Sequence, residues 1–483
     1  MITRLDLRSA ASRATRDPAF LALANRGAVP DSSTRTAARS ILEAVAERGS
    51  DAVRQFGRNF GGGLADGQLV LRGAVLDDST EALEPAVRTA LEEAIANVRR
   101  FAQTQRPSSA MTTIIPGVDI ERRWVPVARV GAYVPGGGAV YPSSLVMTVV
   151  PAQVAGVGSI VVATPARRDG TVDPVLLGLA GLLRVDAVLV AGGAQAVAAL
   201  AFGLPDEAIA PVDLVVGPGN SWVTAAKLEL AGRTAIDLPA GPSEGLVIAT
   251  PPADPEWVAA DLLTQAEHGP DSPAILITTD ATFADAVEAA MRARIAIARR
   301  AAVLAMALER HGRIILVRDV ERAIDLANAY APEHLSIDVP DLEAAVARVV
   351  NAGSVFVGPW APESAGDYAT GANHVLPTGG LARGCGGLAV ETFGKYLQVQ
   401  RITRAGLARL RPTIGTLAAA EGLYAHRDAV EVRFRSTREE ARGGGAGRGG
   451  RGGGGDRGGR GGRGDNDGDG HGGTYPTSAE SRA

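Results

Sequence analysis

Short runs of β-branched residues alternate with longer runs rich in alanine and leucine from about residue 129 onward. The first group of short apolar runs predicts strands at residues 130–134, 159–164, 186–191, 213–216 and 235–238. The runs between them predict helices at residues 144–154, 174–183, 195–201 and 220–230. Strands that alternate with helices predict a parallel sheet covered by helices on both faces.

The same alternation starts again after residue 243. It predicts strands at residues 246–249, 274–278, 313–317, 335–339 and 354–357. It also predicts helices at residues 255–268, 284–307, 320–329 and 342–350. The fold class is therefore α/β, with two Rossmann-like parallel-sheet domains and a central cleft, which is a usual place for a ligand.

The rest of the chain predicts how these domains are bounded. Two amphipathic helices are expected at residues 34–59 and 81–105, and helical patterns return at 389–397 and 411–421. We expect an N-terminal arm at residues 1–31, a first α/β domain at 32–132 plus 243–388, a second at 133–242, a C-terminal helical segment at 389–438, and a tail at 439–483. The Gly/Arg-rich tail has too few apolar groups to offset chain entropy, so we expect it to be disordered.

Composition and charge narrow the possible partners. Hydrophobic residues make up 46% of the chain and the net charge is only −4, as in an ordinary soluble protein that is not attracted to nucleic acid or membrane. Residues 130–166 carry no charge, but prolines interrupt them, so a membrane span is not expected. Aspartates dilute the arginines of the tail, which favours a solvated tail over an RNA-binding one. The N-terminus lacks an apolar core of signal-peptide length, so we expect a cytoplasmic protein.

Cysteine and histidine usage points to particular chemistry. The single cysteine, Cys385, excludes an intrachain disulfide and a cysteine zinc cluster. Four of the six histidines lie in segments dense with polar residues: His268, His334, His374 and His426.

Glu333 and His334 follow Pro332, which should end the preceding helix, so the pair is expected on a helix-to-strand loop. A carboxyl group beside an imidazole suits proton transfer, whereas the alternative is a helix C-cap with a dipole-stabilised histidine.

Nitrogen and oxygen donors recur near the other histidines. Gln265 and His268 are three residues apart and share a helix face, and Asp367 lies on one loop with His374. Glu421 and His426 come near each other only if Gly422 breaks the helix. A set of donors without sulfur suits zinc or a similar divalent ion. A C-capping histidine and an Asp-initiated turn are the alternatives at His268 and Asp367.

Three glycine clusters lie where a strand should pass into a helix, at residues 133–138, 192–195 and 217–220. Glycines there let a ligand approach backbone amides, and a helix N-terminus favours phosphate. The chain has no dinucleotide-binding Gly-x-Gly-x-x-Gly sequence with an acidic residue at the required distance. These clusters therefore leave a cofactor cleft and tight α/β turns equally open.

Together, in this order, the segments resemble the histidinol dehydrogenase family. The matching stretches include Gly131-Ala-Tyr-Val-Pro-Gly-Gly, Ala191-Gly-Gly-Ala-Gln-Ala, Val216-Gly-Pro-Gly-Asn, Ile236-Asp-Leu-Pro-Ala-Gly-Pro-Ser-Glu, Gln265-Ala-Glu-His-Gly-Pro-Asp, Tyr330-Ala-Pro-Glu-His-Leu, Ala365-Gly-Asp-Tyr, Asn373-His-Val-Leu-Pro-Thr and Ala420-Glu-Gly-Leu. The resemblance covers residues 1–437 and leaves out only the glycine-rich tail.

The resemblance implies oxidation of L-histidinol to L-histidine through L-histidinaldehyde, with two NAD and one zinc ion per subunit. It implies His334 as the acid/base and Glu333 as the group that activates water. By the same resemblance, the zinc ligands are Gln265, His268, Asp367 and His426. These six residues, together with Ser243, His374 and Glu421, would also contact the substrate, and the NAD contacts would be Tyr133, Gln195 and Asn220. The first α/β domain would then carry the catalytic and metal residues and the second the NAD side.

The resemblance also implies a homodimer whose C-terminal segment crosses to the partner, so that Glu421 and His426, with His374 as a further candidate, would complete the other subunit's site. One rival is a related NAD-dependent enzyme acting on another small alcohol, such as a sulfonated diol. Glu421 argues against it, because a substrate without an imidazole would not need that acid. The other rival is a non-catalytic binding protein, which the complete ligand set disfavours.

Overall fold

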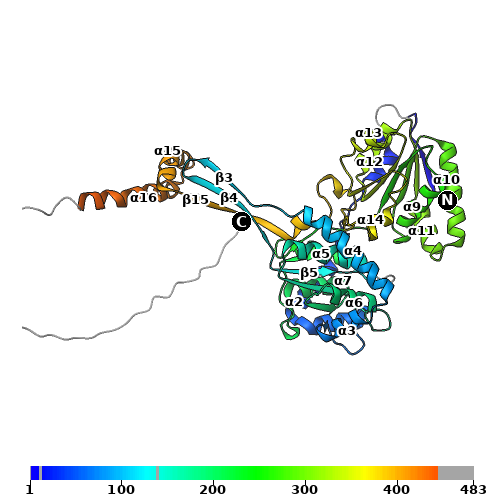
Figure 1. The fold of residues 1–483 in the computed structure, drawn as a ribbon, viewed down its shortest axis with the longest axis horizontal. Helices are drawn as coiled ribbons and strands as arrows, with labels where there is room; N and C mark the ends of the chain where they lie inside the picture. Colours follow the sequence, from blue (N-terminus) through cyan, green and yellow to red (C-terminus); the bar gives the residue numbers. More distant parts are fainter. Residues whose placement is uncertain (1, 10–13, 137–140, 444–483) are drawn as a thin grey trace, which may run out of the picture. The chain divides into compact units, whose positions relative to one another are not determined.

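The structure is a computed structural model that describes residues 2–9, 14–136 and 141–443. Among these residues, two six-stranded sheets and one three-stranded sheet form the framework (Figure 1). The predicted α/β fold class is confirmed. The predicted disordered tail falls mostly at residues 444–483, outside the described ranges, whereas residues 439–443 belong to a helix.

The first sheet has the order β1-β12-β11-β10-β13-β14, and all of its strands are parallel. Their bounds are β1 Thr3–Asp6, β10 Gly245–Ala249, β11 Ala274–Thr278, β12 Arg313–Leu316, β13 His334–Asp338 and β14 Ser354–Val357. One face packs on α9 (Pro255–Glu267), α10 (Ala281–Ile297) and α11 (Ala301–His311). The other packs on α1 (Pro18–Ala24), α12 (Val320–Tyr330) and α13 (Leu342–Val346).

The second sheet has the order β2-β7-β6-β5-β8-β9, with only β2 antiparallel to its neighbour. Its strands are β2 Val70–Leu71, β5 Arg129–Tyr133, β6 Ser159–Thr164, β7 Ala187–Val190, β8 Leu214–Val216 and β9 Ala235–Ile236. One core holds side chains from α3 (Ala74–Glu81), α4 (Pro85–Thr104), α5 (Pro142–Ala155) and α6 (Pro174–Leu182). The other holds side chains from α2 (Ser32–Phe60), α7 (Gly193–Phe202) and α8 (Ser221–Glu229).

Successive side chains of a strand enter opposite cores, as the two-residue period of a β-strand requires. Leu246 and Ile248 of β10 enter one core, whereas Val247 and Ala249 enter the other. Both faces of each sheet are therefore apolar, which explains why the strands read as continuous hydrophobic runs in the sequence.

Packing divides the chain differently from the expected boundaries. Residues 32–60 form α2, which contacts α7 and α8 of the second sheet, and β5 continues to Tyr133 inside that same sheet. Residues 32–132 thus pack mainly with the second sheet, and their contacts with residues 243–388 are fewer, such as the hydrogen bond from Asn97 to the Ala369 carbonyl oxygen. The expected N-terminal arm also contributes an edge strand, since β1 pairs with β12.

Three local predictions differ from the structure. The helix expected at 284–307 is two helices, because Ala298 is extended (ψ 140°) and ends α10. The helical pattern at 389–397 is a short 3-10 helix, η4 (Val390–Phe393), followed by strand β15 (Gly394–Ile402). Strands β3 (Ala110–Ile115) and β4 (Val118–Pro126) were not predicted, and they complete the sheet β15-β4-β3.

Shorter elements are the 3-10 turns η1 (Ala14–Arg16), η2 (Pro205–Glu207) and η3 (Leu381–Arg383), and helix α14 (Glu363–Tyr368).

Residues 115–118 and 401–443 belong to a separate compact unit. In it, α15 (Arg404–Ala420) packs against α16 (Tyr424–Gly443), and Arg411 pairs with Glu431. No helix in the described ranges is long and apolar enough to cross a membrane.

Candidate active site

A cavity of about 590 Å3 collects most of the polar segments singled out in the sequence. The amino ends of β10 and β13 reach it from the first sheet, and the loop after β8 reaches it from the carboxyl end of the second. Its lining includes Tyr141, Ser144, Asn220, Ser243, His268, Glu333, His334, Asp367 and His374. The cavity thus combines predicted substrate, metal and cofactor residues from distant parts of the sequence.

The backbone before Glu333 makes a sharp exit from α12. The helix ends at Tyr330, as Pro332 predicts, and Ala331 adopts the left-handed conformation (φ 55°, ψ 67°). That conformation costs a residue with a Cβ about 1–2 kcal/mol, so surrounding contacts must hold it. His334 then begins β13 opposite Gly245 of β10. Glu333 therefore lies on the predicted helix-to-strand loop, whereas His334 is the first residue of β13 and not a helix cap.

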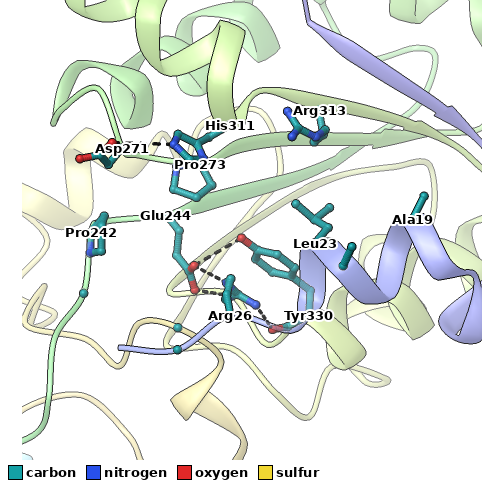
Figure 2. A pocket seen from close by; sticks show the side chains of 14 residues that line it. Ala19, Leu23, Arg26, Pro242, Glu244, Asp271, Pro273, His311, Arg313 and Tyr330 are labelled. Carbon is teal, nitrogen blue, oxygen red and sulfur yellow. Dashed lines mark hydrogen bonds and ion pairs between the residues drawn. The ribbon is translucent and has the colours of Figure 1, made fainter. Parts of the chain in front are cut away.

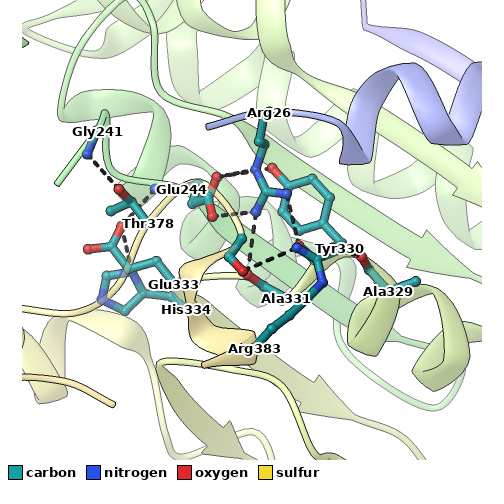
Figure 3. Close-up of polar contacts among 11 residues, drawn as sticks. Arg26, Gly241, Glu244, Ala329, Tyr330, Ala331, Glu333, His334, Thr378 and Arg383 are labelled. Atoms are coloured by element: carbon teal, nitrogen blue, oxygen red, sulfur yellow. Dashed lines mark hydrogen bonds and ion pairs between the residues drawn. The ribbon is translucent and has the colours of Figure 1, made fainter. Parts of the chain in front are cut away.

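Glu333 is 5% exposed and is held by the neighbouring strand. Its Oε2 accepts a hydrogen bond from the backbone N–H of Glu244 at 2.9 Å (Figure 3). Burial raises the pKa of Glu333 well above its usual value, and the nearby acids Glu244, Asp367 and Glu363 raise it further against the effect of that hydrogen bond. This carboxyl group is thus a far stronger base, once deprotonated, than an exposed glutamate.

His334 is 3% exposed and contacts a different partner. The side-chain nitrogen of Gln265 lies 2.9 Å from its Nδ1. An amide nitrogen can only donate, so Nδ1 accepts and the neutral ring carries its proton on Nε2 in this arrangement. Burial lowers the pKa of His334 to about 4, and Asp367 offsets this only in part. The ring is therefore neutral at pH 7 in the metal-free protein.

Asp367 and His374 face each other across the turn that follows α14. Nδ1 of His374 lies 3.1 Å from the backbone carbonyl oxygen of Asp367 and 3.6 Å from its Oδ1. Burial raises the pKa of Asp367, but the hydrogen bond and charge of His374 outweigh it and leave that pKa below its usual value. Asp367 is thus an anionic ligand candidate, and the alternative of a simple Asp-initiated turn does not account for this burial.

A second cavity, of about 520 Å3, lies at the carboxyl edge of the second sheet. Tyr133, Gln195 and Asn220 all line it, together with Gly192 and Gly193. The hydroxyl of Tyr133 accepts a hydrogen bond from the N–H of Gly193 at 3.2 Å, and Asn220 caps the N-terminus of α8. β5 and β8 are adjacent although the chain order reverses between them, which is where α/β sheets bind nucleotides.

Comparison with known proteins then assigns the family. The family model described as histidinol dehydrogenase matches residues 24–434. The chain belongs to the histidinol dehydrogenase family. It is 46% identical to the histidinol dehydrogenase of Nocardia farcinica over 441 residues, which covers 90% of this chain and 98% of that one. It is 44% identical to that of Mycobacterium tuberculosis over 440 residues, with the same coverage.

A solved structure agrees with this assignment. The crystal structure of histidinol dehydrogenase from Elizabethkingia anophelis superposes with a TM-score of 0.83 at 33% identity, covering 90% of this chain and 99% of that one. As a member of the histidinol dehydrogenase family, the chain is an oxidoreductase.

Two of the residues named for this family's site lie elsewhere in the chain. Glu421 and His426 belong to the separate compact unit and are exposed. Gly422, with φ 71°, breaks the helix between them, and this was the condition for Glu421 and His426 to come near each other. The residues described as lining the 590 Å3 cavity all belong to the first unit. Among the described residues, no group of three or more His, Cys, Asp or Glu side chains is arranged to hold a metal ion.

Glu363 is a site residue that the sequence reasoning missed. It is 1% exposed, and its Oε2 accepts a hydrogen bond from Nε2 of Gln265 at 2.7 Å. Burial raises its pKa well above the usual value. Glu363 precedes Asp367 by one turn of α14, so the i, i+4 spacing of two acids on one helix was the available signal.

Proposed function

We propose that the chain oxidises L-histidinol to L-histidine through L-histidinaldehyde, with NAD as the hydride acceptor. Family membership supports the substrate, because the curated relatives are histidinol dehydrogenases. The observation that carries the proposal is the buried Glu333–His334 pair, which lines one cavity with Ser243, His268 and Asp367. An alcohol oxidation followed by an aldehyde oxidation needs a proton acceptor and a group that activates water, and this pair offers both.

The donor set fits a zinc ion. Gln265 Oε1 is a buried oxygen with no hydrogen-bond partner among the residues that the structure describes, while the amide nitrogen of the same side chain is engaged by Glu363 and His334. A buried oxygen left without a partner is costly unless a ligand satisfies it. Gln265, His268 and Asp367 would hold the ion, with His426 as a fourth ligand. Zinc, when bound, orients the substrate and stabilises a developing alkoxide.

In the first oxidation His334 removes the hydroxyl proton of histidinol as the adjacent carbon gives a hydride to NAD. The pKa of about 4 keeps the His334 ring neutral at pH 7, so a ring nitrogen has a lone pair for the proton, and the same low pKa makes the ring a weaker base than a free imidazole. Because Gln265 donates to Nδ1, the neutral ring carries its proton on Nε2, so this contact must break or reverse before transfer. The products of this step are NADH, a proton on His334 and the aldehyde.

In the second oxidation Glu333 takes a proton from a water molecule as its oxygen adds to the aldehyde carbon, and protonated His334 gives its proton to the former carbonyl oxygen. This yields the neutral hydrate and returns His334 to its neutral form. The hydrate that results loses a second hydride to NAD, and His334 again takes the hydroxyl proton. The raised pKa of Glu333 suits the deprotonation of water, because its carboxylate, once deprotonated, is a stronger base than that of an exposed glutamate. The division of labour is that His334 acts in both steps and Glu333 in the second.

Binding residues complete the proposal. Ser243, His374 and Glu421 would hold the substrate, Glu421 through the imidazole ring. Tyr133, Gln195 and Asn220 would contact NAD at the second cavity, where the N-termini of α7 and α8 favour phosphate. Glu421 and His426 would come from the partner subunit of a homodimer, and the enzyme would act in the cytoplasm.

One assay tests this function. Purified protein should form two NADH for each L-histidinol, should lose activity with a chelator, and should regain it with zinc. Turnover of another small alcohol, with none of L-histidinol, would contradict the substrate. Full activity after complete removal of the metal would contradict the role of zinc.

A further inference from the structure

A buried polar network lies directly behind the Glu333–His334 pair and includes Arg26, which precedes α2. Nε of Arg26 donates to Oε2 of Glu244 at 2.6 Å, and Nη2 donates to Oε1 of the same carboxylate. The hydroxyl of Tyr330 donates to Glu244 Oε2 at 3.3 Å, and the guanidinium lies 3.3 Å above the Tyr330 ring. Figure 3 shows this network on one side of Glu244 and Glu333 on the other.

The same guanidinium also holds the exit from α12. Nη1 donates to the carbonyl oxygen of Tyr330 at 2.8 Å, and Nη2 donates to that of Ala331 at 3.4 Å. Ala331 is the left-handed residue that directs the chain from the helix into Pro332 and Glu333. Arg26 therefore connects both backbone segments from which the pair emerges, namely the start of β10 at Glu244 and the end of α12.

Packing alone does not hold these segments. A cavity of about 380 Å3 lies beside the network, and Figure 2 shows Arg26, Glu244 and Tyr330 along its wall, with His311 and Arg313 across from them. Tyr330 packs into the apolar core on one side, but the side that faces the cavity lacks such contacts, so hydrogen bonds contribute to its position there. The planar guanidinium satisfies four acceptors at once, which a lysine ammonium could not match in geometry.

We infer that Arg26 is a positioning residue for the catalytic pair, and above all for Glu333. This inference rests on the proposed function, because it assigns Arg26 to the step that Glu333 performs. The connection runs from Arg26 to the Glu244 carboxylate, and from the Glu244 backbone N–H to Glu333 Oε2 at 2.9 Å. The ring of His334 is held by the Gln265 side chain, whereas the hydrogen bond from Glu244 reaches only the His334 backbone, whose N–H donates to the Glu244 carbonyl oxygen at 3.2 Å. Loss of Arg26 therefore impairs aldehyde oxidation more than alcohol oxidation.

The test compares Arg26→Met with Arg383→Met. Arg383 also binds carbonyl oxygens near the end of α12, those of Ala329 and Gly380, but no hydrogen bond joins it to Glu244 within the described ranges. Rates are measured separately with L-histidinol and with L-histidinaldehyde, together with melting temperatures. Arg26→Met should slow aldehyde oxidation by about 10- to 100-fold, the effect of a small misplacement of a reacting group. Arg383→Met should oxidise both substrates at close to the wild-type rate, and Arg26→Lys should recover part of the loss.

A double variant separates positioning from stability. Arg26→Met leaves the Glu244 carboxylate buried without its ion pair, so that variant can be unstable. Adding Glu244→Gln removes the charge and should restore the melting temperature, while aldehyde oxidation stays slow because no guanidinium joins the two segments. Aldehyde oxidation that recovers with the melting temperature would overturn the inference, as would equal effects of Arg26→Met and Arg383→Met.

Failure of the proposed function has a different signature. It would appear as a wild-type protein that does not oxidise L-histidinol. The same variants are then compared on the alcohol that the wild type does oxidise, and a defect shared equally by Arg26→Met and Arg383→Met would still overturn the role of Arg26.

Discussion

Glu333 and His334 are adjacent in the chain, yet different groups hold their side chains. Glu333 accepts from the Glu244 backbone, whereas His334 contacts the Gln265 amide, and 3.7 Å separates His334 Nδ1 from Glu333 Oε2. Two groups that are held separately can be perturbed separately. This independence is the structural basis for assigning them different steps.

Glu333→Gln should leave the first oxidation nearly intact and slow the second by about 10²- to 10⁴-fold, the usual contribution of a general base. His334→Ala should abolish both. The check is single-turnover NADH formation starting from the alcohol and, separately, from the aldehyde. An equal loss in both steps for Glu333→Gln would show that the carboxyl group serves the site as a whole.

Asp261 gives a prediction about pH and stability. Burial, reinforced by the charge of Asp338, raises the pKa of this α9 side chain to about 6. The folded protein therefore binds a proton that the unfolded chain has lost, and stability falls as the pH rises from about 4 to 6. Asp261→Asn should raise the free energy of unfolding by about 1 kcal/mol at pH 8, after allowance for the partial exposure of the side chain. It should leave that free energy unchanged at pH 4. Urea unfolding at the two pH values measures this, and an equal gain at both would count against it.

At the level of elements, a buried ion pair joins α8 to Asp237, the residue after β9, and both members of the pair bond the loop after β8. The ammonium of Lys227 pairs with Asp237 and donates to the carbonyl oxygen of Gly217 at 3.0 Å, while the N–H of Gly217 donates to Asp237 Oδ2 at 2.8 Å. Both charged side chains are at most 2% exposed. The pair thus holds the glycine loop that ends at Asn220, beside the proposed NAD cavity.

Lys227→Met should destabilise the protein by about 3–5 kcal/mol, because Asp237 is left as an unpaired buried charge. It should also weaken NAD binding, since the loop loses its anchor. Thermal unfolding and an NAD titration measure the two effects. Adding Asp237→Asn should recover part of the lost stability. If the effects of the two substitutions on the free energy of unfolding simply added, Lys227 and Asp237 would not be coupled as an ion pair.

Hydrophobic periodicity predicted most strands and helices of the two sheets, because both faces of each sheet are buried. β6, β11 and β14 begin and end where the pattern placed them. It failed where apolar content was low: β15 has mostly exposed side chains, and its residues read as a helix. The break at Ala298 between α10 and α11 has no glycine or proline to indicate it.

For the site, sequence and resemblance named the side chains that line the cavity but not the residues that hold them. Glu244, Glu363 and Arg26 act through contacts as much as 305 positions apart in the chain. Only the folded chain brings such residues together. Lys227 illustrates the same limit, because within Ala-Ala-Lys-Leu-Glu it reads as an ordinary surface lysine although it is buried.

At the scale of the whole molecule, the proposed homodimer with shared sites predicts complementation. His334 lies in one compact unit and His426 in the other. Mixing inactive His334→Ala and His426→Ala proteins, after dissociation and reassociation, should restore activity to about a quarter of wild type. Half of the dimers would be mixed, each with one intact site of two. No recovery despite demonstrated mixed dimers would mean that each chain uses its own His426.

The pairing of β1 with β12 has a consequence for synthesis. Thr3 lies beside Arg313 in the sheet, and Arg26 must likewise meet Glu244 and Tyr330. At 5–20 residues per second, β1 leaves the ribosome roughly 15 to 60 s before its partner strand exists. During that interval the nascent chain exposes an unpaired strand edge, so bound chaperones or slow codons ahead of β12 should affect the yield of native protein more than events near the C-terminus.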